Sequence, residues 1–173
     1  MADNRNASLG DMLRSIFVIG LILAALAGLG YWFQARPESK VEAVDYVTAA
    51  KAARGVADFK VLAPQSLPKG WKATTVRYDA GVKGQWHLGV LTDKDAYIGL
   101  EQTGLGRKRA LEEFSPDSKP KGSSHVGGYE WQLLQSKHGE TTLVRQEAGY
   151  TILVTGTATE SVIESYVGTL TDH

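Results

Sequence analysis

The feature that most constrains the fold of this chain is an uninterrupted apolar segment close to its N-terminus. Residues 16–33 read IFVIGLILAALAGLGYWF and contain no charged residue and no proline. As an α-helix, this segment would be about 27 Å long, close to the roughly 30 Å hydrocarbon thickness of a bilayer. Tyr31 and Trp32 lie at its end, and such aromatic side chains favour the membrane interface. The sequence therefore predicts a transmembrane helix.

A cleaved signal peptide is an alternative interpretation of the same segment. Residues 16–23 would be its apolar region, and Ala25-Leu26-Ala27 would be its small-residue cleavage site. However, the apolar run continues for six residues beyond Ala27, so cleavage would leave Gly-Leu-Gly-Tyr-Trp-Phe exposed at the new start. This observation favours an uncleaved anchor, with a secreted protein and a buried helix of a soluble protein as the alternatives.

The basic residues around the segment bear on its orientation. Arg5 and Arg14 precede it, and Arg36 and Lys40 follow it, so a comparison of flanking positive charge gives a tie. A short N-terminal tail with Arg14 next to the apolar run is typical of a signal anchor, which leaves the tail in the cytoplasm. We therefore expect the rest of the chain to lie outside the cytoplasm.

These observations predict four parts of the chain. Residues 1–15 are expected to form a short cytoplasmic tail, and residues 16–33 a transmembrane helix that acts as a signal anchor. Residues 34–40 form a short linker, and residues 41–173 form an extracytoplasmic α+β domain. The expected location is the cell membrane, spanned once.

Composition excludes several classes of function. The 19 Lys and Arg residues balance the 19 Asp and Glu residues, so no net positive charge is available to attract nucleic acid. The chain contains no cysteine. This excludes disulfides, thiolate zinc sites, a cysteine nucleophile and a lipid-modified cysteine.

Residue patterns after the membrane segment predict helices at both ends of the domain and strands between them. Residues 41–57 are alanine-rich with Val44, Val47 and Ala50 at helical spacing, which predicts a helix that ends near Gly55. A glycine turn and a short helix are expected over residues 104–114, and a loop over residues 115–124. Alternating apolar residues and turn signals predict strands at 72–78, 85–103 (a hairpin), 129–136, 141–147 and 150–155.

The C-terminal residues complete this prediction. Thr157 and Glu160 have the spacing of a capping box, and apolar residues from Val162 to Leu170 follow at helical spacing. The expected fold class is α+β, with an N-terminal transmembrane helix followed by a two-layer domain. That domain would contain one antiparallel sheet and two main packing helices.

The hairpin QWHLGVLTDKDAYIGLEQT, residues 85–103, allows a prediction of strand register. A three-residue loop, Asp93-Lys94-Asp95, would set Trp86, Leu88 and Val90 opposite apolar partners, whereas a loop of even length would not. Burial of each large apolar side chain is worth roughly 1.5–3 kcal/mol, so the three-residue loop is favoured. On the other face, this register places His87 directly opposite Glu101.

His87 and Glu101 are the candidate catalytic residues. A histidine paired with a carboxylate can transfer protons, but hydrolysis also needs a nucleophile or a substrate pocket, and the sequence places none nearby. We favour a cross-strand polar pair. An envelope hydrolase-like enzyme that uses this pair is the alternative.

Other candidate residues are less specific. Ser124 and His125 are adjacent and point apart in an extended chain, and no pair of histidines has metal-ligand spacing. No metal or cofactor is therefore expected. Arg107, Lys108 and Arg109 follow a glycine turn and are candidates for binding an anion or a lipid head group.

Several short stretches together resemble one known family. The family is the actinobacterial family known as domain of unknown function 4245, whose members are uncharacterised single-pass membrane proteins, and the order of the stretches along the chain resembles the order in that family. The stretches are Asp45-Tyr46, APQSLPKGW at 63–71, WHLGV at 86–90, YIGLEQT at 97–103 and VTGTAT at 154–159. The resemblance covers nearly the whole chain. It implies a membrane location and domain boundaries, and it implies no activity, because the family provides no known catalytic residues or ligand.

The sequence therefore predicts a membrane-tethered domain of the cell envelope that binds rather than catalyses. Its expected partners are the membrane, through residues 16–33, and an unidentified envelope protein or envelope molecule. A hydrolase-like enzyme and a cleaved, secreted protein are the alternatives.

Overall fold

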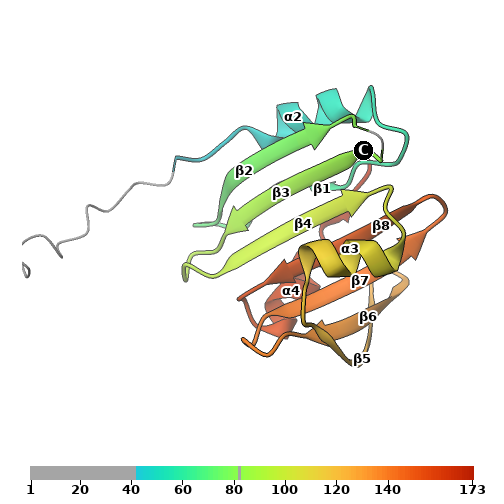
Figure 1. The fold of residues 1–173 in the computed structure, drawn as a ribbon. Coiled ribbons are helices and arrows are strands. Elements are labelled where there is room, and N and C mark those ends of the chain that lie inside the picture. Colours follow the sequence, from blue (N-terminus) through green and yellow to red (C-terminus); the bar gives the residue numbers. More distant parts are fainter. Residues whose placement is uncertain (1–41, 82) are drawn as a thin grey trace, which may run out of the picture. The chain divides into compact units, whose positions relative to one another are not determined.

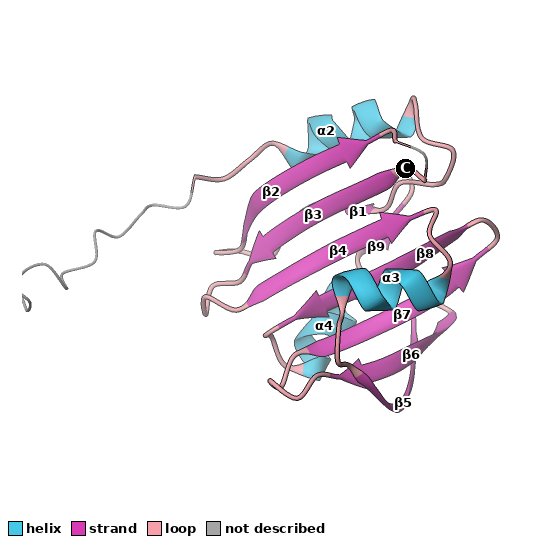
Figure 2. Cartoon of the chain, in the orientation of Figure 1, coloured by secondary structure: helices cyan, strands magenta, loops and turns pink. Residues whose placement is uncertain are grey.

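The structure, a computed structural model, describes residues 42–81 and 83–173 (Figure 1). In this part of the chain, one sheet contains seven antiparallel strands in the order β2-β3-β4-β8-β7-β6-β5 (Figure 2). These strands are Lys72–Asp79 (β2), Gln85–Leu91 (β3), Tyr97–Thr103 (β4), Lys119–Val126 (β5), Tyr129–Gln135 (β6), Thr141–Glu147 (β7) and Tyr150–Gly156 (β8). Two shorter strands, Ala63–Pro64 (β1) and Leu170–Thr171 (β9), pair with each other.

Three helices accompany the sheet in the described part of the chain: Tyr46–Arg54 (α2), Arg107–Phe114 (α3) and Glu160–Val167 (α4). The predicted membrane helix at 16–33 lies outside the described residues, as do the predicted tail and linker. Of the helices that the structure describes, none has the length and apolar character needed to cross a membrane. The longest, α2, has nine residues.

The helices cover both faces of the sheet. One face carries the main core, in which side chains of α2 and α4 pack with Trp86, Leu88 and Leu100 of the central strands. On the opposite face, α3 packs over β7 and β8 and buries Ala110 beside Val144 and Leu153 (Figure 1). The predicted two-layer arrangement is therefore incomplete, because the apolar side of α3 adds a third layer over part of the sheet. The α+β class and the antiparallel sheet are confirmed.

The predicted register of the β3–β4 hairpin is confirmed. Trp86 pairs with Gln102, Leu88 with Leu100 and Val90 with Ile98, and the apolar members of these pairs are fully buried. The loop between the strands also has the predicted length, because the backbone N–H of Thr92 donates to the Ala96 carbonyl and leaves three residues between them. Asp95 in this loop has a φ of 57°.

The β5 strand was not predicted, because residues 115–124 read as a loop. It is an edge strand whose residues are mostly exposed, so it needs no apolar alternation. The register of β5 shifts between Pro120 and Gly122. Proline cannot donate a hydrogen bond to a neighbouring strand, and at a sheet edge this has little cost.

Both terminal helices differ in detail from the prediction. Helix α2 begins after Asp45, which accepts a hydrogen bond from the Thr48 backbone N–H. It buries Tyr46, Ala50 and Ala53, whereas Val47, which was predicted to face the core, is 54% exposed. The predicted capping box is absent from α4. Its N-cap is Thr159, because the Thr157 hydroxyl instead accepts a hydrogen bond from the Tyr97 backbone N–H.

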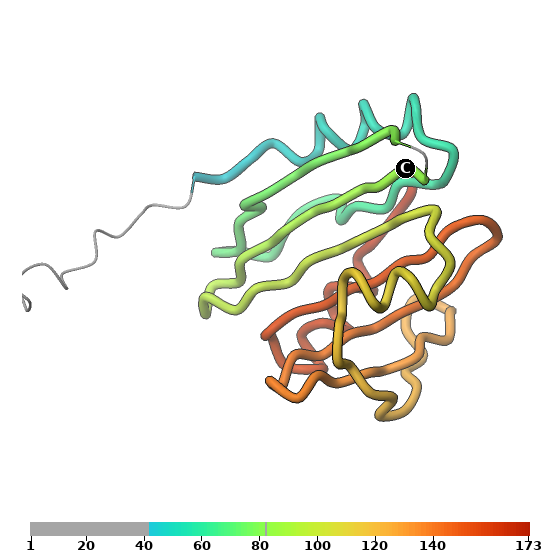
Figure 3. The backbone as a smooth tube through the Cα atoms, in the orientation of Figure 1, coloured from blue at the N-terminus to red at the C-terminus, as the bar shows by residue number. Residues whose placement is uncertain are grey.

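Gln102 fixes the segment that leads into β1. Its side chain is fully buried on β4, where its Oε1 atom accepts from the Leu62 N–H at 2.6 Å and its Nε2 atom donates to the Lys60 carbonyl at 2.9 Å. The Trp86 indole donates to the Leu62 carbonyl at 2.9 Å. These three bonds hold residues 60–62 against the central strands, next to the C-terminal segment that forms β9 (Figure 3).

Tyr166 on α4 provides a test of the core. Its ring is buried against Trp71, and its hydroxyl has no hydrogen-bond partner among the described residues. Burial raises the pKa of this phenol far above its usual value. Because the pKa of Tyr166 is raised in the folded state, this group leaves the free energy of unfolding undiminished below the unfolded-state pKa of about 10. The free energy of unfolding then falls as the pH rises above that value.

We therefore expect Tyr166→Phe to increase the free energy of unfolding by about 1 kcal/mol at neutral pH, since it removes a buried unpaired hydroxyl. The variant should also lose less stability than the wild type between about pH 9 and about pH 11. Urea unfolding followed by circular dichroism at both pH values measures these effects. A variant less stable than the wild type at neutral pH would show that the hydroxyl has a partner.

Candidate functional site

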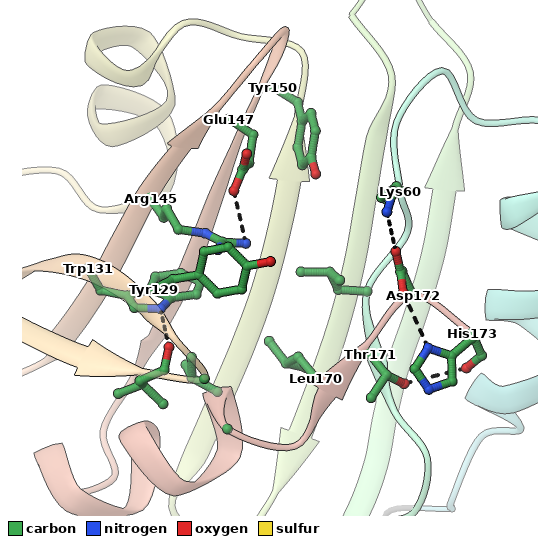
Figure 4. A pocket seen from close by; sticks show the side chains of 15 residues that line it. Lys60, Tyr129, Trp131, Arg145, Glu147, Tyr150, Leu170, Thr171, Asp172 and His173 are labelled. Atoms are coloured by element: carbon green, nitrogen blue, oxygen red, sulfur yellow. Dashed lines mark hydrogen bonds and ion pairs between the residues drawn. The ribbon is translucent and has the colours of Figure 1, made fainter.

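A pocket of about 420 Å³ lies on the α4 side of the sheet, between β6–β8 and the C-terminal segment (Figure 4). Its walls combine aliphatic, aromatic and charged side chains. The lining residues are Lys60, Leu62, Val126, Gly127, Tyr129, Trp131, Arg145, Glu147, Tyr150, Val167, Gly168, Leu170, Thr171, Asp172 and His173.

Arg145 is the most unusual residue of this pocket. It lies on β7 two residues after the buried Leu143, so strand alternation turns its side chain toward the core, where only 12% of it is exposed. The guanidinium carbon lies 3.6 Å from the centre of the Tyr129 ring and 4.9 Å from that of Trp131. Its Nη2 atom pairs with Glu147 at 3.1 Å. Arg145 is thus held between aromatic rings and one carboxylate.

Two nitrogens of Arg145, Nε and Nη1, are buried without a hydrogen-bond partner. The two aromatic rings lie close to the guanidinium carbon, but neither gives these two nitrogens a hydrogen-bond partner. A buried donor without an acceptor costs roughly 1–3 kcal/mol, and more when it is charged. The arrangement is therefore suited to an acceptor that enters from the pocket.

The opposite wall carries a second ion pair, in which Lys60 lies 2.8 Å from Asp172 (Figure 4). The hydrogen bond from Lys60, followed by that from His173, lowers the pKa of the Asp172 carboxyl. Lys60 is 77% exposed, so water and salt screen this pair. With Arg145 and Glu147 facing it, the pocket has two cations and two carboxylates.

Two further hollows continue from the pocket along the same end of the sheet. One of about 490 Å³ shares Lys60, Tyr150 and Asp172 with it. The next, of about 260 Å³, shares Asp58, Phe59 and Tyr150 with the second. The rings of Phe59 and Tyr150 stack with centres 5.3 Å apart. Tyr150 lines all three hollows.

The predicted His87–Glu101 pair lies on the other face of the sheet, and its cross-strand position is confirmed. The Nδ1 atom of His87 contacts the Glu101 carboxylate, and the Gln85 amide donates to that carboxylate at 3.2 Å. Both members of the pair are mostly buried, with 16% and 14% of their side chains exposed. This contact fixes the His87 ring and leaves its Nε2 atom on the side of Gly89.

Tyr97 covers the two glycines beside this pair. Gly89 and Gly99 face each other across β3 and β4, and a Cβ atom on either one would come within about 3 Å of the Tyr97 hydroxyl. The tyrosine ring therefore lies flat on a surface that only glycine provides. Burial, and then the nearby Glu101 carboxylate, raise the pKa of Tyr97.

This second site has a histidine whose ring is held in one orientation by a carboxylate. Among the described residues, no serine or threonine hydroxyl is hydrogen-bonded to His87. The serine next to His125 is directed elsewhere, since the Ser124 hydroxyl donates to Glu164 of α4. Residues 42–81 and 83–173 also contain no cluster of three potential metal ligands. Within these residues, no serine or threonine hydroxyl is bonded to His87 as an activated nucleophile would be.

The basic residues Arg107, Lys108 and Arg109 are exposed at the start of α3. The Arg107 backbone N–H already donates to the Gln146 side chain at 3.0 Å, so part of the helix N-terminus is occupied. The binding of an anion or a lipid head group by Arg107, Lys108 and Arg109 stays a prediction.

The sequence reasoning missed the Arg145 pocket. The sequence signal for this pocket is the alternation of inward and outward positions along TTLVRQE, residues 141–147. This alternation places Arg145 on the same side of the strand as Leu143. A charged residue at an inward position needs a partner, and such a position is a candidate site. The contribution of Lys60 and Asp172 to the pocket could not be predicted from the sequence, because it depends on the pairing of β1 with β9, which lie more than 100 residues apart.

Comparison with known proteins adds a family assignment. The family described as Protein of unknown function (DUF4245) matches residues 5–170, nearly the whole chain. A search of curated proteins found no match.

Proposed function

The chain belongs to the DUF4245 family of proteins of unknown function, and we propose that it is a membrane-tethered binding protein of the cell envelope. Its α+β domain lies outside the cytoplasm and is held at the membrane by residues 16–33. The ligand is an envelope molecule, and it binds in the pocket that contains Arg145. The apolar N-terminal segment supports the tether.

The pocket is the observation that carries this proposal. Its volume of about 420 Å³ lies within the usual range of small-molecule sites. Such sites have mostly apolar and aromatic walls with a few polar groups that fix the orientation of the ligand. Leu62, Leu170 and the rings of Tyr129 and Trp131 provide apolar contacts in a pocket whose walls are more polar than is usual for such sites, and Arg145 provides an orienting group.

An envelope hydrolase is the second candidate function, and the fixed His87 ring favours it. Glu101 holds the ring by one nitrogen, as the carboxylate does in a catalytic triad. The substrate would then bind on the opposite face of the sheet, over Gly89 and Tyr97. The two functions therefore place the ligand on different faces. A cleaved, secreted form would not be attached to the membrane by residues 16–33, but the two candidate functions would still place the ligand on different faces of the sheet.

Photo-crosslinking at two exposed tyrosines separates the two candidate functions. Tyr129 beside the pocket is 54% exposed, and Tyr97 beside His87 is 39% exposed. Each is replaced in the full-length protein by p-benzoylphenylalanine, which keeps an aromatic ring at the position. We expect irradiation of intact cells to attach an envelope molecule of defined mass at position 129 and not at position 97, as detected by mass spectrometry.

A third position serves as the control for random collisions. Lys51 on α2 is exposed and neither lines the Arg145 pocket nor contacts His87, so its photo-reactive variant reports the background. A specific product at position 97 alone would contradict the pocket proposal and favour the hydrolase. The same products at all three positions would contradict specific binding on either face.

A further inference from the structure

We propose that the ligand of the pocket carries a single carboxylate on an apolar body, and that Arg145 binds the carboxylate. This inference rests on the proposed function, because it assumes that the pocket is the binding site. It goes further by assigning the chemical class of the ligand and the residue that selects it.

The first argument comes from the N–H donors of Arg145. A guanidinium has five N–H bonds, and three of them belong to Nε and Nη1. Both atoms are buried without a partner in the described part of the chain, while Glu147 contacts only Nη2. Carboxylates match the planar donor arrangement of arginine and form charge-assisted hydrogen bonds with it. A ligand carboxylate at the Nη1 end would therefore accept a hydrogen bond that the protein leaves without an acceptor.

The second argument concerns access to these donors. Tyr129 lies over the guanidinium and directly follows the Gly127-Gly128 turn, in which both glycines have positive φ. More than half of Tyr129 is exposed, so its ring can move into solvent without breaking the core. Trp131, on the same strand, is 2% exposed and its indole donates to the Val126 carbonyl. Tyr129 is thus a movable cover, and Trp131 is a fixed wall.

The third argument limits the charge of the ligand. Glu147 and Asp172 line the same pocket as Arg145 and Lys60, so the walls have no excess of positive charge. A dianion such as phosphate would meet two carboxylates that repel it, whereas a monoanion can bind Arg145 at a smaller cost. Leu62 and Leu170 also line the pocket and offer contacts to an apolar body. These features favour a lipophilic monocarboxylate.

Benzoate and its neutral isostere benzamide are suitable probes. The full-length ¹⁵N-labelled protein is titrated in a non-ionic detergent, at constant ionic strength, while the Arg145 Nε–H and Trp131 indole resonances are recorded by NMR. We expect benzoate to shift both resonances with saturation, and benzamide to bind at least tenfold more weakly. Arg145→Gln should weaken benzoate binding at least tenfold.

Lys51→Gln is the matched control, because it removes one positive charge at an exposed position on α2 that does not line the pocket, and it should leave benzoate binding unchanged. The comparison of the two probes uses the wild-type protein, so it holds even when Arg145→Gln fails to fold. Equal binding of benzoate and benzamide would overturn the carboxylate inference but leave the pocket as a binding site. Tighter binding of inorganic phosphate than of benzoate would also overturn it. The absence of shifts with every probe would overturn both this inference and the proposed pocket.

Discussion

Trp86→Ala is expected to lower the free energy of unfolding by about 3–5 kcal/mol, the usual cost of truncating a buried aromatic side chain. The Trp86 side chain is fully buried in the main core, and its indole donates to the Leu62 carbonyl. The substitution removes the packing and leaves that carbonyl without its partner. Urea unfolding of the variant and the wild type, followed by circular dichroism, measures the difference.

His87→Ala is the matched control, because His87 is the next residue on β3 and faces the other side of the sheet. Its loss removes one polar contact, and Glu101 keeps its hydrogen bond from Gln85. The expected cost is about 1 kcal/mol or less. A larger cost for His87→Ala than for Trp86→Ala would contradict the register, since a shift by one residue exchanges the two faces.

The second large effect is expected at Gly156 on β8. A methyl group there would overlap the Tyr97 carbonyl oxygen and lie 3.1 Å from the Ile98 Cα atom. Both neighbours are backbone atoms, and Ile98 pairs with residues on both flanking strands, so they cannot move aside easily. We expect Gly156→Ala to lower the free energy of unfolding by about 2–3 kcal/mol, as overpacking in a core does.

Gly122 provides the same substitution without the clash. It lies on the edge strand β5, and a Cβ atom there would meet nothing within 4 Å. Alanine also restricts the unfolded chain, so Gly122→Ala should be neutral or stabilise by up to about 1 kcal/mol. Thermal unfolding of both variants tests the pair. Equal melting temperatures would contradict the close approach of β4 and β8 at Gly156.

The sequence was informative wherever local patterns decide the structure. Alternation and loop length were enough to predict the pairing of Leu88 with Leu100 and of His87 with Glu101, because the wrong register would waste apolar burial. The sequence failed at β5, where an edge position removes the need for alternation. The short helix expected within residues 104–114 is confirmed as α3, but its apolar side is too short to reveal from the sequence which face of the sheet it covers.

The candidate pocket was harder to predict for a different reason. Its side chains come from segments far apart in the chain, so no local pattern unites them. Lys60 and Asp172 meet because β1 pairs with β9, and Arg145 meets Trp131 because β6 pairs with β7. Only the inward position of Arg145 was visible in the sequence, and it indicates a site without naming its partners.

The orientation of the chain tests the central claim, an extracytoplasmic binding domain, most directly. The chain has no cysteine, so a single introduced cysteine reports its own location. Ser123→Cys lies at an exposed position on β5, and Ser8→Cys lies in the N-terminal tail. In intact cells, a membrane-impermeant maleimide should label position 123 and reach position 8 only after lysis. Labelling of position 8 alone before lysis would place the domain in the cytoplasm and contradict the proposed function.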